Sequence, residues 1–300
     1  MSDSTRNRII LVLIFVLPFA FFFALLEFGN HPAPLADSPM PNPNGYDTFV
    51  NAGELLQGQA GLYETMSELE LASLVASNSE ALAIMRSAFS NECRVPVQYS
   101  VGYWQNHTKD LIALRNLAQT LAAEGRLAEL ENRPDDAAKS YLDAIHFGSE
   151  SGRGGFVADV MIGDTIESLG TERLQNLSSE LDAKSCRETA AALESFETNR
   201  PAWADVMEQE DIMRSRVNPG LKNYITYLWK HKQVAETTRK AENAFQGQEA
   251  KTRRLMIQLA ARAYDLEKGH PPASISDLVP DYLKAIPRDP STGAKMALPP

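Results

Sequence analysis

Hydrophobic and polar positions divide this chain into one uninterrupted apolar run and a long series of amphipathic segments. The stretch from Ile9 to Leu26 carries no charge, whereas apolar residues beyond position 45 recur at intervals of three and four. Such intervals are typical of helices with one buried face. The pattern therefore predicts an all-α protein, an irregular multi-helix bundle preceded by an N-terminal transmembrane helix and ending in a small turn-rich segment.

The apolar run is long enough to cross a bilayer, because 18 residues at about 1.5 Å each reach roughly 27 Å. Arg6 and Arg8 precede it, and the next stretch, residues 27–85, holds eight acidic residues and no Lys or Arg. The positive-inside rule then predicts a cytoplasmic N-terminus. A cleaved signal peptide is the alternative, although its apolar region is usually shorter, about 7–15 residues. We expect an uncleaved single-pass anchor in a bacterial inner membrane.

The predicted organisation follows from these boundaries and from five prolines between residues 30 and 44, which favour an extended spacer. It comprises a cytoplasmic tail (1–8), a transmembrane helix in contact with lipid (9–28), a proline-rich linker (29–45), a helical extracytoplasmic or periplasmic domain (46–250), and a long helix with a turn-rich C-terminus (251–300).

Helical spacing and cap residues locate the individual helices of the body. Asp47 is expected to cap the first, and Ser67 and Ser77 each begin a capping-box pattern. Pro96 restricts residues 93–104 to an edge strand or a loop. The longer helices are expected at 108–132, 134–147, 156–177, 184–198, 202–216, 220–231, 234–246 and 249–268.

One hairpin matches part of the tetratricopeptide pattern. Gly125, Ala137, Tyr141 and Ala144 occupy its small-residue, alanine and aromatic positions, but shifting by one repeat in either direction finds no second copy. The segment 121–144 is therefore either a single TPR-like hairpin or an ordinary helical hairpin, and it predicts no repeat array.

Two acidic positions fall on a helix that is apolar nearly all round. Asp164 and Glu167 lie in the segment 156–177, where a carboxylate is costly unless it is paired. Glu210 shares a helical stripe with Trp203, and Arg214 is its expected partner. Carboxylates from neighbouring helices could form an acid–base pair or a metal site, or they could be structural groups held by hydrogen bonds and arginines. Asp164, Glu167 and Glu210 are the weak catalytic candidates.

Other chemistry has little support in the sequence. A net charge of −10 disfavours nucleic acid as a partner. The five histidines are scattered singly, and neither a metal-binding spacing nor a nucleophile elbow is present, so we predict no cofactor and identify no small-molecule ligand. Cys93 and Cys186 are expected in a compartment that permits disulfides; they could pair or remain buried thiols.

The stretch 255–296 resembles the C-terminal region of type II secretion pseudopilins: a helix, a glycine–proline break, a Leu-Val-Pro turn at 278–280 and an Arg-Asp-Pro loop at 288–290. The chain lacks the glycine–phenylalanine processing site of that family, and the acid of its apolar helix, Glu27, stands at the far end. As a whole the chain is similar to a class of bacterial single-pass membrane-anchored helical proteins with no assigned activity, which share the Asn-Gly-Tyr-Asp start at 44–47.

These features leave three functional hypotheses. The first is a membrane-anchored envelope scaffold that contacts other envelope proteins through its helical surface. The second is an enzyme that uses the buried acids of the helical core. The third, implied by the resemblance, is an accessory component related to secretion or pili.

Overall fold

The computed structural model describes residues 39–217 and 221–299, with the side chains of 221–232 excepted. Its regular elements are helical, which confirms the all-α prediction for this part of the chain. They are α3 (Gly45–Glu54), η2 (Tyr63–Thr65), α4 (Glu68–Ser77), α5 (Ser79–Ala88), α6 (Tyr103–Leu130), α7 (Pro134–Ser151), α8 (Val157–Leu177), α9 (Ala183–Thr198), α10 (Trp203–Val217), α11 (Leu221–Lys268) and η3 (Ile275–Leu278).

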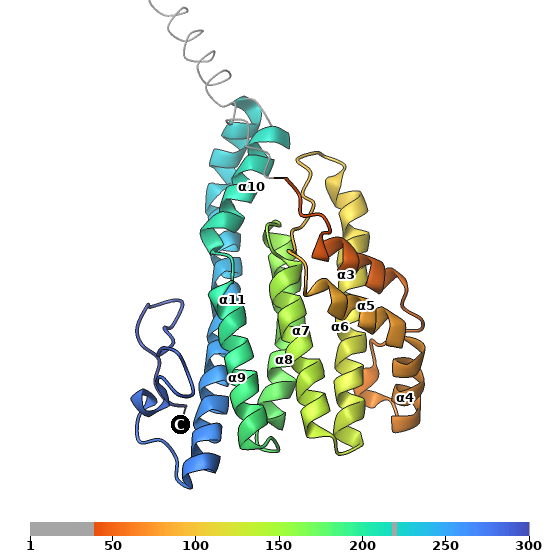
Figure 1. The fold of residues 1–300 in the computed structure, drawn as a ribbon. Helices are drawn as coiled ribbons and strands as arrows, with labels where there is room; N and C mark the ends of the chain where they lie inside the picture. The colour runs from red at the N-terminus through yellow and green to blue at the C-terminus, as the bar shows by residue number, and fades with distance from the viewer. Residues whose placement is uncertain (1–38, 218–220, 300) are drawn as a thin grey trace, which may run out of the picture.

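The long helices α6, α7, α8, α9 and α11 stand side by side, and the short helices α3, α4 and α5 cover the outer face of α6 (Figure 1). Helix α8 contacts α6, α7, α10 and α11, so it lies at the centre of the body. This position agrees with its apolar circumference, because a helix that is apolar on every side must be covered on every side.

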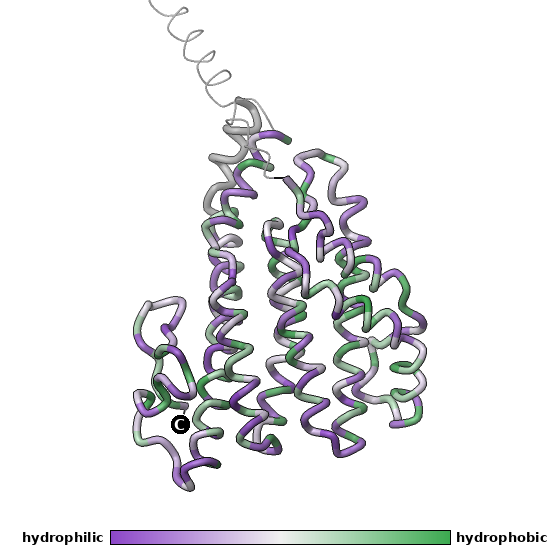
Figure 2. The backbone as a smooth tube through the Cα atoms, in the orientation of Figure 1, coloured by the Kyte–Doolittle hydropathy of each residue, from purple (hydrophilic) through white to green (hydrophobic). Residues whose placement is uncertain are grey.

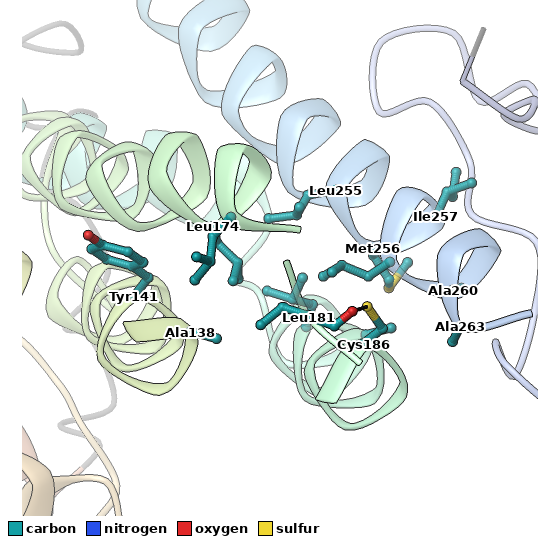
Figure 3. Packing of buried hydrophobic residues seen from close by; sticks show 14 of the residues in the cluster. Ala138, Tyr141, Leu174, Leu181, Cys186, Leu255, Met256, Ile257, Ala260 and Ala263 are labelled. Carbon is teal, nitrogen blue, oxygen red and sulfur yellow. Dashed lines mark hydrogen bonds between the residues drawn. The ribbon is translucent and has the colours of Figure 1, made fainter. Parts of the chain in front are cut away.

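Two large hydrophobic clusters lie on either side of this centre. The first joins α7, α8, α9 and α11 to the C-terminal segment, and Figure 3 shows Leu174, Leu255 and Met256 meeting there. The second joins α3, α5 and α6 to α7 and α8 around Phe49 and Phe147, whose rings meet edge to face with centroids 4.7 Å apart.

The expected hairpin geometry is present between α6 and α7. The ring of Tyr141 lies directly against Gly125, where any larger side chain would overlap it. The Tyr141 hydroxyl donates a hydrogen bond to Glu129 at 2.7 Å. A small residue on one helix therefore makes room for an aromatic residue on the other.

The largest difference from the predicted helices concerns the last third of the chain. The three helices expected at 220–231, 234–246 and 249–268 form the single 48-residue helix α11. Gly247 falls between the last two of these ranges, yet a glycine inside a helix costs only about 1 kcal/mol relative to alanine. The buried residues Phe245, Ala250 and Leu255 on either side of it stabilise the helix by more than that.

The caps agree with the sequence in part. Ser67 and Glu70 form the predicted capping box of α4. The first described helix is capped by Asn44 rather than Asp47, because the Asn44 side chain accepts from the backbone of Tyr46 at 3.2 Å. Helix α5 lacks its predicted capping box: its N-cap is Asn78, whose side chain binds the backbone of Gln57 instead.

The C-terminal segment packs against the body. Leu278, Tyr282 and Leu283 are buried with α9 and α11. The Tyr282 hydroxyl donates to Glu267 at 2.7 Å, and the Arg187 guanidinium lies 4.2 Å from the centroid of the Tyr282 ring. Residues 269–299 are thus held by apolar, hydrogen-bond and cation–π contacts.

The predicted transmembrane helix (9–28), the cytoplasmic tail (1–8) and most of the proline-rich linker (29–45) lie outside the described residues. Within the described part of the chain, no helix combines the length and the apolar character that crossing a membrane requires. Figure 2 shows hydrophobic and hydrophilic positions alternating along these helices.

Candidate functional site

The central helix α8 lies unusually close to α7 because glycines face each other across their contact. A Cβ atom added at Gly148 would lie 2.5 Å from the backbone nitrogen of Glu167 and 2.6 Å from the carbonyl oxygen of Gly163. Real Cβ atoms do not approach backbone that closely. The two helices are therefore packed backbone to backbone, and the middle of α8 is withdrawn from solvent.

Glu167 lies at this contact and is fully buried, as its sequence position predicted. Its Oε1 atom accepts from the Arg200 guanidinium and from the Thr252 hydroxyl, each at 2.5 Å. Arg200 comes from the connection between α9 and α10, and Thr252 comes from α11. Glu167 is thus the point at which three segments distant in sequence are joined.

The network extends outward through a second carboxylate. Arg200 also pairs with Glu197 at 2.8 Å, and Glu197 accepts from Arg253 at 2.8 Å. Arg253 pairs in turn with Glu249. The side chains of Arg200 and Glu197 are each only 7 % exposed, so these charges interact with little screening by water.

Asp164 lies one turn before Glu167 on α8 and is 9 % exposed. Its Oδ2 atom is buried and has no hydrogen-bond partner within the described residues. Burial, reinforced by the negative charges of Glu167 and Glu249, raises the pKa of Asp164 to about 8, although Arg200 acts in the opposite direction. This carboxyl group therefore holds a proton at neutral pH.

A groove opens next to Asp164 between α8 and α11. It encloses about 370 Å³ and is lined by Met161, Asp164, Thr165, Ser168, Ala244, Gly247, Gln248 and Lys251. The Lys251 ammonium lies 3.6 Å from Glu172, and its side chain is half exposed. A volume of this size suits a small ligand or one long side chain.

The third acid predicted from the sequence lies elsewhere. Glu210 on α10 is half-buried and accepts from the backbone nitrogen of Val157 at 2.9 Å, at the first residue of α8. Ten residues of helix, about 15 Å, separate Val157 from Glu167. Asp164 and Glu167 are therefore neighbours, but Glu210 does not join them; it accepts from the free Val157 amide at the N-terminus of α8.

A second buried polar cluster was missed by the sequence analysis. His107 of α6 hydrogen-bonds through Nε2 to Asp159 of α8, and its Nδ1 lies 3.4 Å from Asp110. The other oxygen of Asp159 accepts from the backbone nitrogen of Phe156 at 2.7 Å. The only available signal was an aspartate in the first turn of a predicted helix, and it named no histidine as a partner.

Aromatic rings enclose His107. Tyr46 and Tyr103 stack on its ring with centroids 6.3 and 4.6 Å away, and Trp104 meets it at 5.9 Å. The hydroxyls of Tyr46 and Tyr103 are buried without a partner in the described structure. Burial and the nearby Asp159 raise the pKa of both phenols, which therefore stay neutral.

The two cysteines are free thiols in different hydrophobic clusters. Cys93 packs with α3, α5 and α6, whereas Cys186 packs with α9 and α11. Burial raises the pKa of both, to about 12 for Cys93 and about 11 for Cys186. The structure thus shows the unpaired alternative, in which each cysteine acts as a small hydrophobic residue.

Metal-binding geometry is lacking in the part of the chain that the structure describes: no three His, Cys, Asp or Glu side chains converge there as ligands would. The acidic pair beside the groove is the feature with the clearest chemical consequence, because in the described structure Asp164 Oδ2 and Glu167 Oε2 are both buried without a hydrogen-bond partner. No family model, curated protein or solved structure matches this chain.

Proposed function

We propose that this protein is a membrane-anchored scaffold of the bacterial cell envelope. In this proposal residues 9–28 span the inner membrane, and the helical body stands on the extracytoplasmic side, where it contacts other envelope proteins. The support from the sequence is the charge-free run at Ile9–Leu26, with arginines before it and only acidic charges in the stretch 27–85 that follows.

The observation that carries the proposal is the placement of the chain ends along α11. The described chain begins near the end of the body where α10 leads into α11, and α11 runs from there to the opposite end (Figure 1). Its 48 residues extend about 72 Å at 1.5 Å per residue. A body tethered at its first described residues would carry its C-terminal segment well away from the membrane.

The far end of α11 is stiffened by contacts that suit a scaffold. Arg253 donates to the carbonyl oxygen of Arg288 at 2.5 Å, and Lys284 donates through its backbone nitrogen to Glu194 at 2.9 Å. These bonds, together with buried Leu278 and Leu283, fix the C-terminal segment to α9 and α11. The distal surface therefore has a defined shape before any partner binds, which reduces the entropic cost of binding.

In-cell photocrosslinking on the full chain tests the proposal. A photoreactive residue at Leu266 on the distal part of α11, which is 45 % exposed, is expected to give discrete protein adducts. Leu69 on α4, 80 % exposed, is the matched position on the opposite side of the body. A reporter fused after residue 300 should be active only outside the cytosol. Cytosolic activity, or the absence of adducts from both positions, would contradict the scaffold.

One observation favours the enzyme hypothesis as a second candidate. Asp164 keeps its proton at neutral pH beside an open groove, as a general acid would. Its neighbour Glu167, however, is held through Oε1 by Arg200 and Thr252 and is fully buried, so it is not positioned as an accessible second carboxylate. Replacing Glu210 by Gln while keeping Asp164 should leave any acid-dependent turnover intact, because Glu210 lies at the other end of α8.

A further inference from the structure

The α8 wall of the groove and Gln248 present hydrogen-bond acceptors, and the cation that lines the groove, Lys251, is paired with Glu172 at 3.6 Å. The Thr165 hydroxyl donates to the carbonyl oxygen of Met161 at 2.8 Å, and the Ser168 hydroxyl donates to that of Thr165 at 2.8 Å. Both hydroxyl protons are thereby used, and the oxygen lone pairs remain. Gln248 likewise uses its amide nitrogen on Thr171, at 3.2 Å, which leaves its carbonyl oxygen as an acceptor.

Asp164 adds an ionisable acceptor to this set. The residue is more than nine-tenths buried, lines the groove, and has an Oδ2 atom without a partner in the described structure. A buried carboxyl group in this state is stabilised either by keeping its proton or by receiving a cation. The groove is thus built to accept hydrogen bonds from a positively charged donor.

The charges behind the groove also favour a positively charged ligand. Glu167, Glu197 and Glu249 face two arginines, Arg200 and Arg253, which leaves an excess of one acid in the network, and the Lys251–Glu172 pair at the groove adds no net charge. The chain as a whole carries a net charge of −10. An anionic ligand would be repelled by this field, whereas a cation would compensate it.

The shape of the groove selects among cations. Met161, Ala244 and Gly247 provide an apolar wall, and the space above Gly247 is open. A metal ion would need several charged or neutral ligands converging on one point, and the described residues offer no such cluster. A primary ammonium on an aliphatic chain fits better: it has three N–H donors and no acceptor, and its methylenes can lie on the apolar wall.

We propose that the α8–α11 groove binds a primary alkylammonium group, with Asp164 as its counter-ion and Thr165, Ser168 and Gln248 as hydrogen-bond acceptors. The ammonium could come from a lysine side chain or from a free aliphatic diamine, since both present the same group. This site does not depend on the membrane topology proposed above, and it can be measured on the purified protein.

Calorimetric titration of the full chain in detergent micelles tests the site. The probes are cadaverine, Nα-acetyl-lysine-methylamide, and the same lysine derivative acetylated on Nε. We expect saturable binding at one site for at least one of the two ammonium probes, and none for the Nε-acetylated control. Whichever ammonium probe binds more tightly identifies the source. No saturable binding of either, or equal binding of the acetylated control, would overturn the proposal.

Two variants assign the binding to the groove. Asp164→Asn removes the counter-ion and keeps the shape, and Gly247→Leu fills the open wall; each should weaken binding at least tenfold. Glu236→Gln, which removes a surface acid of α11 outside the groove, should leave binding unchanged. Binding insensitive to both groove variants would overturn the assignment. A thermal melt of each variant confirms folding.

Proton release provides a second readout that a merely structural Asp164 would not give. Because Asp164 holds a proton in the free protein, an incoming ammonium must displace it. Titrations at pH 7 in buffers of different ionisation enthalpy should therefore show up to about one proton released per ligand in the parent chain, and none in Asp164→Asn. Binding without proton release would contradict the role of Asp164 as counter-ion.

Discussion

Helix α8 carries two buried acidic clusters whose carboxyl groups differ in how fully they are hydrogen-bonded. At its first turn, both oxygens of Asp159 are occupied, one by His107 and one by the backbone of Phe156. Five residues later, Asp164 has an unpartnered oxygen and a groove beside it. In the first cluster the carboxylate is satisfied from within the chain, and the aromatic rings around it include two tyrosines whose buried hydroxyls have no partner in the described structure. The second is incomplete, and this difference is why we place a ligand at Asp164.

The comparison can be tested most strongly through the pH dependence of Asp164→Asn. The unfolded carboxyl group loses its proton near pH 4, whereas the folded one keeps it until about pH 8. The folded state therefore binds more protons in this window, and the parent protein loses stability as pH rises through it. The variant should gain relative to the parent by up to about 1.4 kcal/mol per pH unit between pH 4 and 8.

Urea unfolding of the parent protein and of Asp164→Asn at pH 4, 6 and 8 measures this effect. Asp205→Asn, on the exposed surface of α10, is the matched control. The control should follow the parent at every pH. A constant difference between Asp164→Asn and the parent across the range would mean that Asp164 is ionised in the folded protein, like an ordinary carboxylate.

Removing the cation of the second cluster is the next largest change. Arg200→Met leaves Glu167 and Glu197 buried without their shared partner, which should lower the free energy of unfolding by about 3–5 kcal/mol. Adding Glu167→Gln should recover part of this loss, because one uncompensated charge disappears. Denaturant titration of the single and double variants measures the coupling, and strictly additive losses would mean that the two side chains do not interact.

The sequence indicated that these acids are buried but not what holds them. An apolar circumference around residues 156–177 predicted a central helix, and with it the burial of Asp164 and Glu167. The partners of Glu167 lie 33 and 85 positions further along the chain, at Arg200 and Thr252. Periodicity within one helix carries no information about such pairings, because they depend on how α9 and α11 dock.

The same limit explains the errors in the second half of the chain. Helical spacing and cap residues predict three separate helices between residues 220 and 268, whereas tertiary packing on α8 and α9 makes α11 continuous. In the sequence His107 is one of five scattered histidines, because its partner Asp159 lies 52 positions away. Capping was more predictable where the signal was strictly local, as at Ser67.

The close approach of α7 and α8 supports both clusters, and Gly148→Ala should disturb it. The added methyl group would meet backbone atoms at 2.5 and 2.6 Å, and such overpacking costs about 1–3 kcal/mol. Gly247→Ala on α11 is the matched control, because its methyl group would enter open space and should stabilise the helix by up to about 1 kcal/mol. Thermal unfolding of both variants should shift in opposite directions; a neutral Gly148→Ala would refute backbone-to-backbone packing.

The smallest expected effect is on the pH dependence of stability, and it distinguishes two buried histidines: His107, in the cluster with Asp159, and His146, outside it. Burial alone would lower the pKa of His107, but its hydrogen bond to Asp159 and the charges of Asp159 and Asp110 outweigh burial and raise it. His146, stacked between Phe89 and Phe196, has its pKa lowered, chiefly by burial. The stabilisation from His107 is therefore complete below about pH 6.5 and declines as pH rises through its folded pKa.

For His146 the sign is reversed, because the folded state resists its protonation as pH falls below about 6.5. His107→Gln should consequently cost about 1–3 kcal/mol at pH 6 and less at pH 8, whereas His146→Gln should be better tolerated, relative to the parent, at pH 5 than at pH 8. Unfolding free energies measured from pH 5 to 8 distinguish the two. Parallel pH profiles for both variants would show that Asp159 does not hold a charged His107, and the contrast between the satisfied and the incomplete cluster of α8 would then rest on geometry alone.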